Sequence, residues 1–161
     1  MAAPIPELAA RFGFRTDQGC IDARTWRQGT LVLAVPLVIL VLIWLFWAPF
    51  ARPEAESAMA SVWEMLAAYL YLLCYGFAVL LIAISHYNLS TKRWRDRGWR
   101  FPGALAGLLP LLALFSGGAH LVQPRVAEVM SCWYVVIVDA ALAAVVVWNA
   151  VELGYLKGVP R

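Results

Sequence analysis

Long apolar runs alternate with short polar segments along this chain. Four runs, at about residues 31–50, 62–88, 103–122 and 129–153, contain no lysine or arginine. A helix needs roughly 20 residues to cross a hydrocarbon core of about 30 Å, so each run is long enough to span a bilayer. The pattern therefore predicts an all-α membrane protein with four transmembrane helices.

Positive charges divide unequally between the two sides of the implied membrane. Of the 13 lysines and arginines, all but Arg52 and Arg125 precede the first run, separate the second from the third, or follow the fourth. Positively charged loops stay in the cytoplasm, so we expect both termini and the loop between the second and third spans to be cytoplasmic.

The same pattern sets the domain organisation. We expect a cytoplasmic juxtamembrane segment at 1–30, a transmembrane domain at 31–153 and a cytoplasmic tail at 154–161. The first run begins after some thirty mixed residues and precedes no small-residue cleavage site, which indicates an uncleaved span and not a signal peptide. A chain that is 63% hydrophobic leaves no room beside these spans for a soluble domain of ordinary size.

The net charge of +3 does not indicate nucleic-acid binding, because the basic residues border the apolar runs. In that position they would meet anionic lipid headgroups, which we expect as partners. The basic loop could also dock a protein partner, and the two roles are compatible. The residues expected to contact lipid or a partner are Arg24, Trp26, Arg27, Lys92, Arg93, Trp94, Arg95, Arg97, Trp99 and Arg100.

Asp139 is the one acid in the middle of an apolar run, between Val138 and Ala140. An ionised carboxylate at such a depth costs about 2.5–3.5 kcal/mol or more, so Asp139 must be protonated, paired or facing water. It could carry protons or bind an ion, or it could hydrogen-bond a neighbouring helix. We expect no second acid and no basic residue at comparable depth, which favours the helix-to-helix bond.

Candidate cofactor ligands are few. His86 lies near the inner end of the second span and His120 near the outer end of the third, so the two cannot share a metal ion within one chain. Both fit interfacial helix ends, and Glu64 and Glu152 fit solvated helix ends. There is no nucleophile triad, paired catalytic carboxylates or phosphate loop, which predicts a non-enzymatic protein with no catalytic site. We expect bound lipid and no metal or other cofactor, and leave haem or quinone open.

Small residues mark two faces for close helix packing. Gly103 and Gly107 form a GxxxG pattern in the third span, and Ala140 and Ala144 repeat the spacing in the fourth. Such residues let transmembrane backbones approach closely. We expect these faces to pack within the bundle, although a larger complex would use the same surfaces.

The segment from Lys92 to Trp99, Lys-Arg-Trp-Arg-Asp-Arg-Gly-Trp, resembles the Arg-Arg-Leu-His-Asp…Gly-Trp motif of the bacterial inner-membrane family called "domain of unknown function 805". That family also places its motif between the second and third spans. Its further elements are partly matched by Arg24-Thr-Trp-Arg27, Pro110 and Gly158-Val-Pro160. The resemblance implies a multi-pass protein of the bacterial inner membrane and implies no activity.

Three functions remain open from the sequence. The first is an accessory subunit or helper of a larger membrane complex, respiratory, photosynthetic or transport, with a membrane-protein partner. The second is a small transporter or proton-conducting protein that uses Asp139. The third is a haem or quinone redox protein that uses His86 or His120.

Overall fold

The structure, a computed structural model, describes residues 14, 19–47, 62–123, 126–128 and 130–156. Over these ranges the chain forms helices and no strand. The helices are α2 (Ala23–Trp47), α3 (Val62–Asp96), α4 (Pro102–Val122) and α5 (Cys132–Gly154). Each of the four is long and apolar enough to cross a membrane. The predicted all-α class with four candidate spans is therefore confirmed, and the chain is a multi-pass membrane protein.

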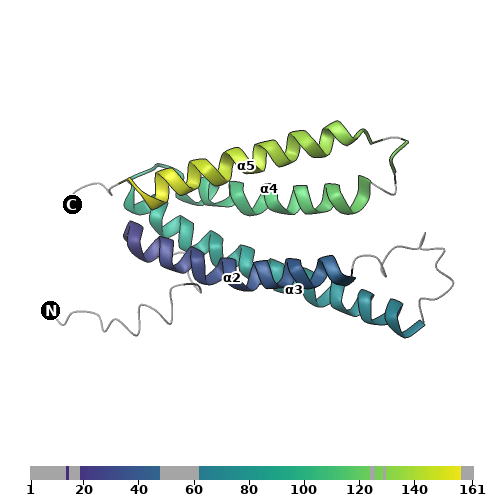
Figure 1. The fold of residues 1–161 in the computed structure, drawn as a ribbon. Helices are drawn as coiled ribbons and strands as arrows, with labels where there is room; N and C mark the ends of the chain where they lie inside the picture. Colours follow the sequence, from purple (N-terminus) through teal and green to yellow (C-terminus); the bar gives the residue numbers. More distant parts are fainter. Residues whose placement is uncertain (1–13, 15–18, 48–61, 124–125, 129, 157–161) are drawn as a thin grey trace.

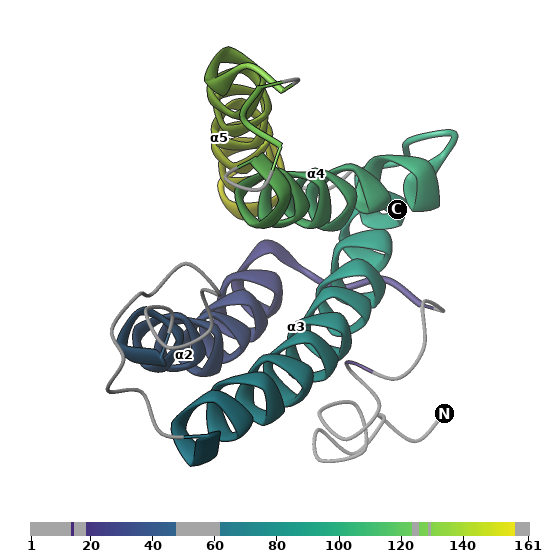
Figure 2. The same ribbon diagram turned by 90° about the vertical axis from the view of Figure 1, so that its right-hand side faces the viewer.

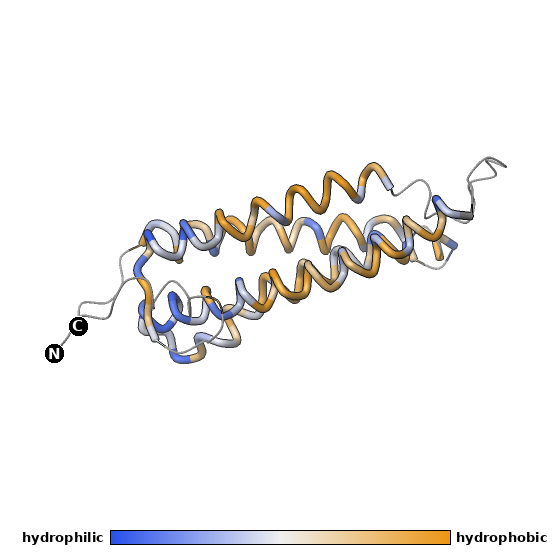
Figure 3. Tube along the Cα trace, turned by 90° about the horizontal axis from the view of Figure 1, so that it is seen from below, coloured by the Kyte–Doolittle hydropathy of each residue, from blue (hydrophilic) through white to orange (hydrophobic). Residues whose placement is uncertain are grey.

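The helices run up and down, so that α2 and α4 begin where α3 and α5 end (Figure 1). We call this the basic end, because Arg24, Arg27 and the segment 92–100 lie there, and we call the opposite end the far end. Viewed from the far end, α2 and α3 form one pair and α4 and α5 another (Figure 2). Hydrophobic residues follow the long middle stretches of the helices, and hydrophilic residues gather at the basic end (Figure 3).

Local capping sets several helix boundaries. The helix α2 begins at Ala23 and not near Leu31, because the Asp22 carboxylate accepts a hydrogen bond from the Thr25 amide at 3.0 Å. A hydrogen bond with the Thr25 side chain lowers the pKa of Asp22 below its usual value, and the bond from the Thr25 amide lowers it further. Ser131 caps α5 in the same way through the Trp133 amide.

The largest difference from the predicted spans concerns α3. The apolar run ends near Asn88, but the helix continues to Asp96, so most of the predicted basic loop is helical. The turn into α4 is confined to the next few residues, where Gly98 adopts a φ of 75°. The hydropathy of a segment measures its transfer into lipid and not its tendency to form a helix. Because lysine and arginine are good helix formers, a helix can continue beyond the apolar run in which it begins.

The buried hydrophobic cluster of the described residues lies at the basic end. Its members come from all four helices and are Trp26, Leu89, Trp94, Ala106 and Leu153. The long apolar middles of the helices are mostly exposed, as expected of surfaces that acyl chains cover. Water reaches only the ends of a membrane bundle, so the hydrophobic effect acts most strongly there.

Glycines allow close helix contacts at this end. A Cβ added to Gly29 in α2 would lie 2.8 Å from a methyl group of Leu89 in α3. A Cβ on Gly103 in α4 would lie 2.9 Å from the hydroxyl of Tyr87. These two glycines therefore place α2 and α4 directly against the last turns of α3.

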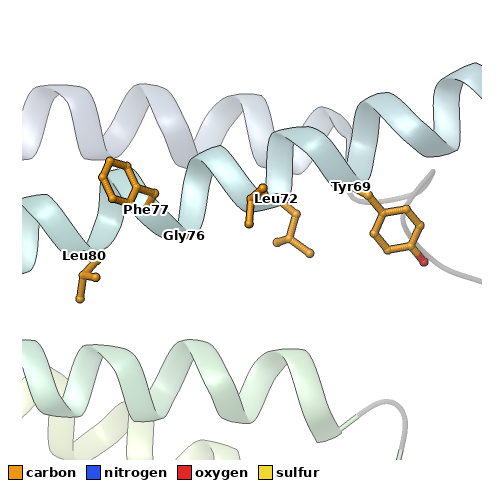
Figure 4. A pocket seen from close by; sticks show the side chains of 6 residues that line it. Tyr69, Leu72, Gly76, Phe77 and Leu80 are labelled. Atoms are coloured by element: carbon orange, nitrogen blue, oxygen red, sulfur yellow. The ribbon is translucent and has the colours of Figure 1, made fainter.

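Aromatic contacts join α2 and α3 towards the far end. Trp44 stacks on Tyr71 and Tyr75, with ring centroids 6.4 and 6.1 Å apart, and the Tyr71 hydroxyl donates to the Leu40 carbonyl. Another part of the surface of α3 carries an apolar hollow, and all of its lining residues come from that helix (Figure 4). It is lined by Tyr69, Leu72, Leu73, Gly76, Phe77 and Leu80. Most of these side chains are exposed on the surface of α3.

Gly29→Leu should destabilise the protein by about 1–3 kcal/mol, because the new side chain overpacks a buried contact with Leu89. Gly76→Leu is the matched control, since a Cβ at Gly76 meets nothing within 4 Å. The free energy of unfolding of the purified full chain in detergent measures both effects. Equal stability of the two variants would show that α2 and α3 do not approach as described.

Candidate functional site

Arg93 is the most interconnected charged residue at the basic end. Its side chain is 1% exposed, and its Nε donates to the Leu153 carbonyl at 2.9 Å. Its two other guanidinium nitrogens bond to the Leu156 carbonyl and to the Asp96 carboxylate. The last carbonyls of a helix lack intrahelical donors and carry partial negative charge. Arg93 therefore caps the end of α5 with a cation supplied by α3.

Two further arginines tie neighbouring segments to the end of α3. Arg97 forms an ion pair with Glu152 of α5 at 2.6 Å, and Arg95 donates to the Gly19 carbonyl at 3.1 Å. Glu152 is thus paired with Arg97, in the turn directly after α3, and is not the solvated end acid that the sequence indicated. These bonds hold α5 and the segment before α2 against one helix end.

Aromatic side chains fill the space between these polar bonds. Trp94 is fully buried, with its ring 5.1 Å from Trp148 and 5.5 Å from Trp99. Trp26 donates from Nε1 to the Ser90 hydroxyl at 3.2 Å and packs edge-on against His86. The basic end is therefore a packed interior with several hydrogen bonds across it, although the buried Nε1 of Trp94 has no partner among the described residues.

This packing revises part of the predicted lipid or partner surface. Four of the ten predicted contact residues, Trp26, Lys92, Arg93 and Trp94, are buried and present no surface to a lipid or a partner. Arg95 and Arg97 are half-buried in the bonds described above. The exposed members are Arg24, Arg27, Trp99 and Arg100, for which the prediction stands. The predicted contact residues were expected to be exposed because most of them are charged. The structure buries Arg93 because its cation bonds to the carbonyls at the end of α5.

A second polar cluster lies within the candidate spans, between α4 and α5. The Ser116 hydroxyl donates to one oxygen of Asp139 at 2.5 Å, and the other oxygen lies 2.8 Å from Nε2 of His120. We call these residues the Ser116–Asp139–His120 cluster. Asp139 lies seven residues after Cys132 and Ser116 six residues before Val122, so both lie about 10 Å from the far end of their helix.

The partnership with His120 corrects one expectation. The sequence placed no basic or acidic group at the depth of Asp139, but His120 lies one helical turn above Ser116 and reaches the same carboxylate. Because α4 and α5 are antiparallel neighbours, counting inward from the link between them pairs Asp139 with Ser116, which lie seven and six residues from their helix ends. His120 lies one turn nearer the link and reaches the carboxylate with its side chain.

The cluster is not covered by the described helices. Ser116 is buried, but the side chain of Asp139 is 41% exposed and that of His120 is 61% exposed. Exposed ionisable groups are costly within the hydrocarbon region unless something polar covers them. The far half of the α4–α5 pair therefore combines a bonded carboxylate with unused hydrogen-bonding capacity.

The predicted small-residue faces behave differently from one another. Gly103 and Gly107 face Tyr87 of α3, so this pattern packs within the bundle. Ala140 and Ala144 are exposed on α5, which corrects the expectation that they pack inside. A small-xxx-small spacing marks a close-approach face without saying whether its partner is in the same chain.

The histidines lie at opposite ends of the molecule. His86 is buried beside Trp26 at the basic end, whereas His120 bonds to Asp139 towards the far end. Among the described residues, no three of the types His, Cys, Asp and Glu come together as metal ligands would. The polar groups that the structure does bring together are thus the Ser116–Asp139–His120 cluster and the arginine bonds of the basic end.

No protein-family model matches the chain, and no curated protein or solved structure matches it either. The resemblance of residues 92–99 to a bacterial inner-membrane family therefore stays a prediction. The structure adds that this motif forms the end of α3 and the turn after it.

Arg93→Met should lower the free energy of unfolding by about 3 kcal/mol, because it removes a buried cation together with its hydrogen bonds to α5. Arg100→Met is the control, since Arg100 is exposed and its loss should change stability by no more than about 0.5 kcal/mol. Denaturant titration of the full chain in detergent measures both. A loss that is equally small for both variants would contradict the helix-capping role.

Proposed function

We propose that this protein is a non-enzymatic accessory subunit or helper of a larger membrane complex, respiratory, photosynthetic or transport, in the bacterial inner membrane. The observation that supports this most is the half-exposed pair of Asp139 and His120 within the candidate spans. An exposed polar pair in lipid is costly, and a neighbouring membrane protein that covers it would remove that cost. The exposed Ala140 and Ala144 beside it would let another helix approach.

The proposed orientation places the basic end and both termini in the cytoplasm. It rests on the positive-inside rule, because only Arg52 and Arg125 lie in the segments assigned to the opposite side. The exposed Arg24, Arg27 and Arg100 would then face anionic lipid headgroups of the cytoplasmic leaflet.

The geometry of the cluster does not favour catalysis by a serine nucleophile. In a nucleophile triad the histidine lies between serine and acid, so that it takes the hydroxyl proton. Here Asp139 lies in the middle, bonded to Ser116 through one oxygen and to His120 through the other. The histidine is therefore placed to pair with the acid, which supports a binding role.

A second candidate function, proton conduction or small-ion transport, gains from His120. A relay needs more than one titratable station, and His120 supplies a second group 2.8 Å from Asp139. The redox hypothesis gains no such support, because His86 and His120 lie at opposite ends and do not form one ligand pair.

The accessory role predicts a stable assembly after gentle solubilisation. The tagged full chain should migrate in mild detergent as a complex of fixed stoichiometry, larger than one chain in a micelle. Asp139→Leu should release the partner, whereas Tyr69→Phe, on the lipid-facing surface of α3, should not. Native electrophoresis and light scattering measure the size. A wild-type protein that remains a single chain would refute the accessory role.

The conduction hypothesis predicts a proton flux through the purified protein alone. In liposomes with a potassium gradient and valinomycin, the wild type should acidify or alkalise the lumen faster than empty vesicles. Asp139→Asn should abolish the excess and His120→Gln should reduce it severalfold, because each removes one of the paired groups. A wild-type rate equal to that of empty liposomes would exclude conduction by the isolated chain.

A further inference from the structure

The Asp139 carboxylate has more acceptor capacity than its two partners use. It receives one bond from Ser116 and one from His120, whereas an ionised carboxylate offers about four lone-pair sites. Since 41% of the side chain is exposed, the carboxylate is not enclosed between α4 and α5. The cluster therefore presents an acceptor site to whatever lies beside these helices.

The depth of Asp139 in the membrane distinguishes a lipid headgroup from a protein side chain as the source of a hydrogen-bond donor for its carboxylate. Trp133 and Tyr134 are exposed at the start of α5, where aromatic side chains mark the membrane interface. Asp139 lies five residues further in, about 8 Å deeper at 1.5 Å per residue. A lipid amine belongs at or above the aromatic level, whereas a side chain of a neighbouring transmembrane helix can lie at any depth.

The described cations of this chain do not fill that position. The exposed ones, Arg24, Arg27 and Arg100, lie at the basic end, and Lys92 is buried there. Arg93, Arg95 and Arg97 are engaged with α5 and the segment before α2. Arg125, in the link between α4 and α5, lies outside the described residues. Apart from His120, which already lies 2.8 Å from Asp139, a basic side chain that takes the unused lone pairs is therefore sought outside this chain, with Arg125 as the internal alternative to test.

The surface next to the cluster suits a helix as the carrier of that charge. Ala140, the residue after Asp139, is exposed together with Ala144 one turn along. Small side chains here let another helix approach closely enough for a lysine or arginine to reach the carboxylate. Within hydrocarbon such a pair is worth more than on a surface in water, because neither charge is screened by solvent.

From these observations we propose that the Ser116–Asp139–His120 cluster binds a transmembrane helix of a partner protein through a lysine or arginine at the depth of Asp139. Asp139 accepts the charged donor, while Ser116 and His120 hold its carboxylate in place. This inference rests on the proposed accessory role and specifies the partner's chemistry.

The experiment uses the full chain, carrying a donor fluorophore, in phosphatidylcholine vesicles. The probe is a synthetic leucine-rich transmembrane peptide with one lysine about 10 Å from the end that matches the far end of the bundle. Control peptides carry leucine at that position or the lysine near the opposite end. Energy transfer measures association, and the lysine peptide should bind at least tenfold more tightly than either control.

Variants of the chain locate the effect. Asp139→Asn should abolish the tenfold preference, and His120→Gln should weaken it. Glu128→Gln is the matched control, because Glu128 is an exposed acid in the link and should leave the preference unchanged. Circular dichroism and elution volume identify any variant that fails to fold, and the lysine scan on the wild type remains decisive in that case.

Three outcomes would overturn the inference. The first is equal binding of the lysine and leucine peptides. The second is a preference that appears only in Arg125→Gln, since the chain would then supply its own cation. The third is lysine-independent association of the chain with itself, which would make a second copy the occupant. A native complex lost in Asp139→Leu, without any lysine preference, would leave the accessory role standing and refute this partner chemistry alone.

Discussion

The cap that Arg93 places on α5 is the interaction on which the rest of the fold depends. It brings a cation from the end of α3 to the last carbonyls of α5, two elements some sixty residues apart in sequence. A helix end buried without donors would be strongly unfavourable, so the burial of Leu153 at the end of α5 requires this arginine. Trp94 can then pack on Trp148, and α5 is fixed beside α3.

The two helix pairs are anchored to each other at the basic end, and they are less constrained relative to each other towards the far end. At the basic end, Trp26, Leu89 and Leu153 form a cluster shielded from water, and polar bonds run between α3 and α5. Towards the far end the aromatic and polar contacts described above lie within each pair, as in the Trp44–Tyr71 stack and the Ser116–Asp139 bond. Acyl chains solvate apolar helix faces as well as leucine does, so little protein packing is required there.

The sequence could predict the spans because hydropathy reports directly on partition into lipid. It could not predict that α3 continues to Asp96, since that continuation depends on helix propensity and on contacts with α5. For the same reason the burial of Arg93 is visible only in three dimensions. Counting from the short link between α4 and α5 could have placed Ser116 opposite Asp139, whereas the contact of His120 from one turn nearer the link is visible only in three dimensions. The exposure of Ala140 on α5 could not be predicted from the sequence, because small residues occur in the same spacing on buried and on exposed helix faces.

The two polar regions differ in how far groups of their own chain cover and pair them, and this difference supports the proposed binding role of the Ser116–Asp139–His120 cluster. At the basic end Arg93, Asp96 and Glu152 find partners across the fold, so these charges serve mainly to hold it together. The Asp139 carboxylate also has partners, but with His120 it remains open to the surroundings where exposure costs most. A fold that pairs its buried charges at one end, and leaves a carboxylate and an imidazole exposed among the candidate spans, is best explained if these groups meet something outside the chain.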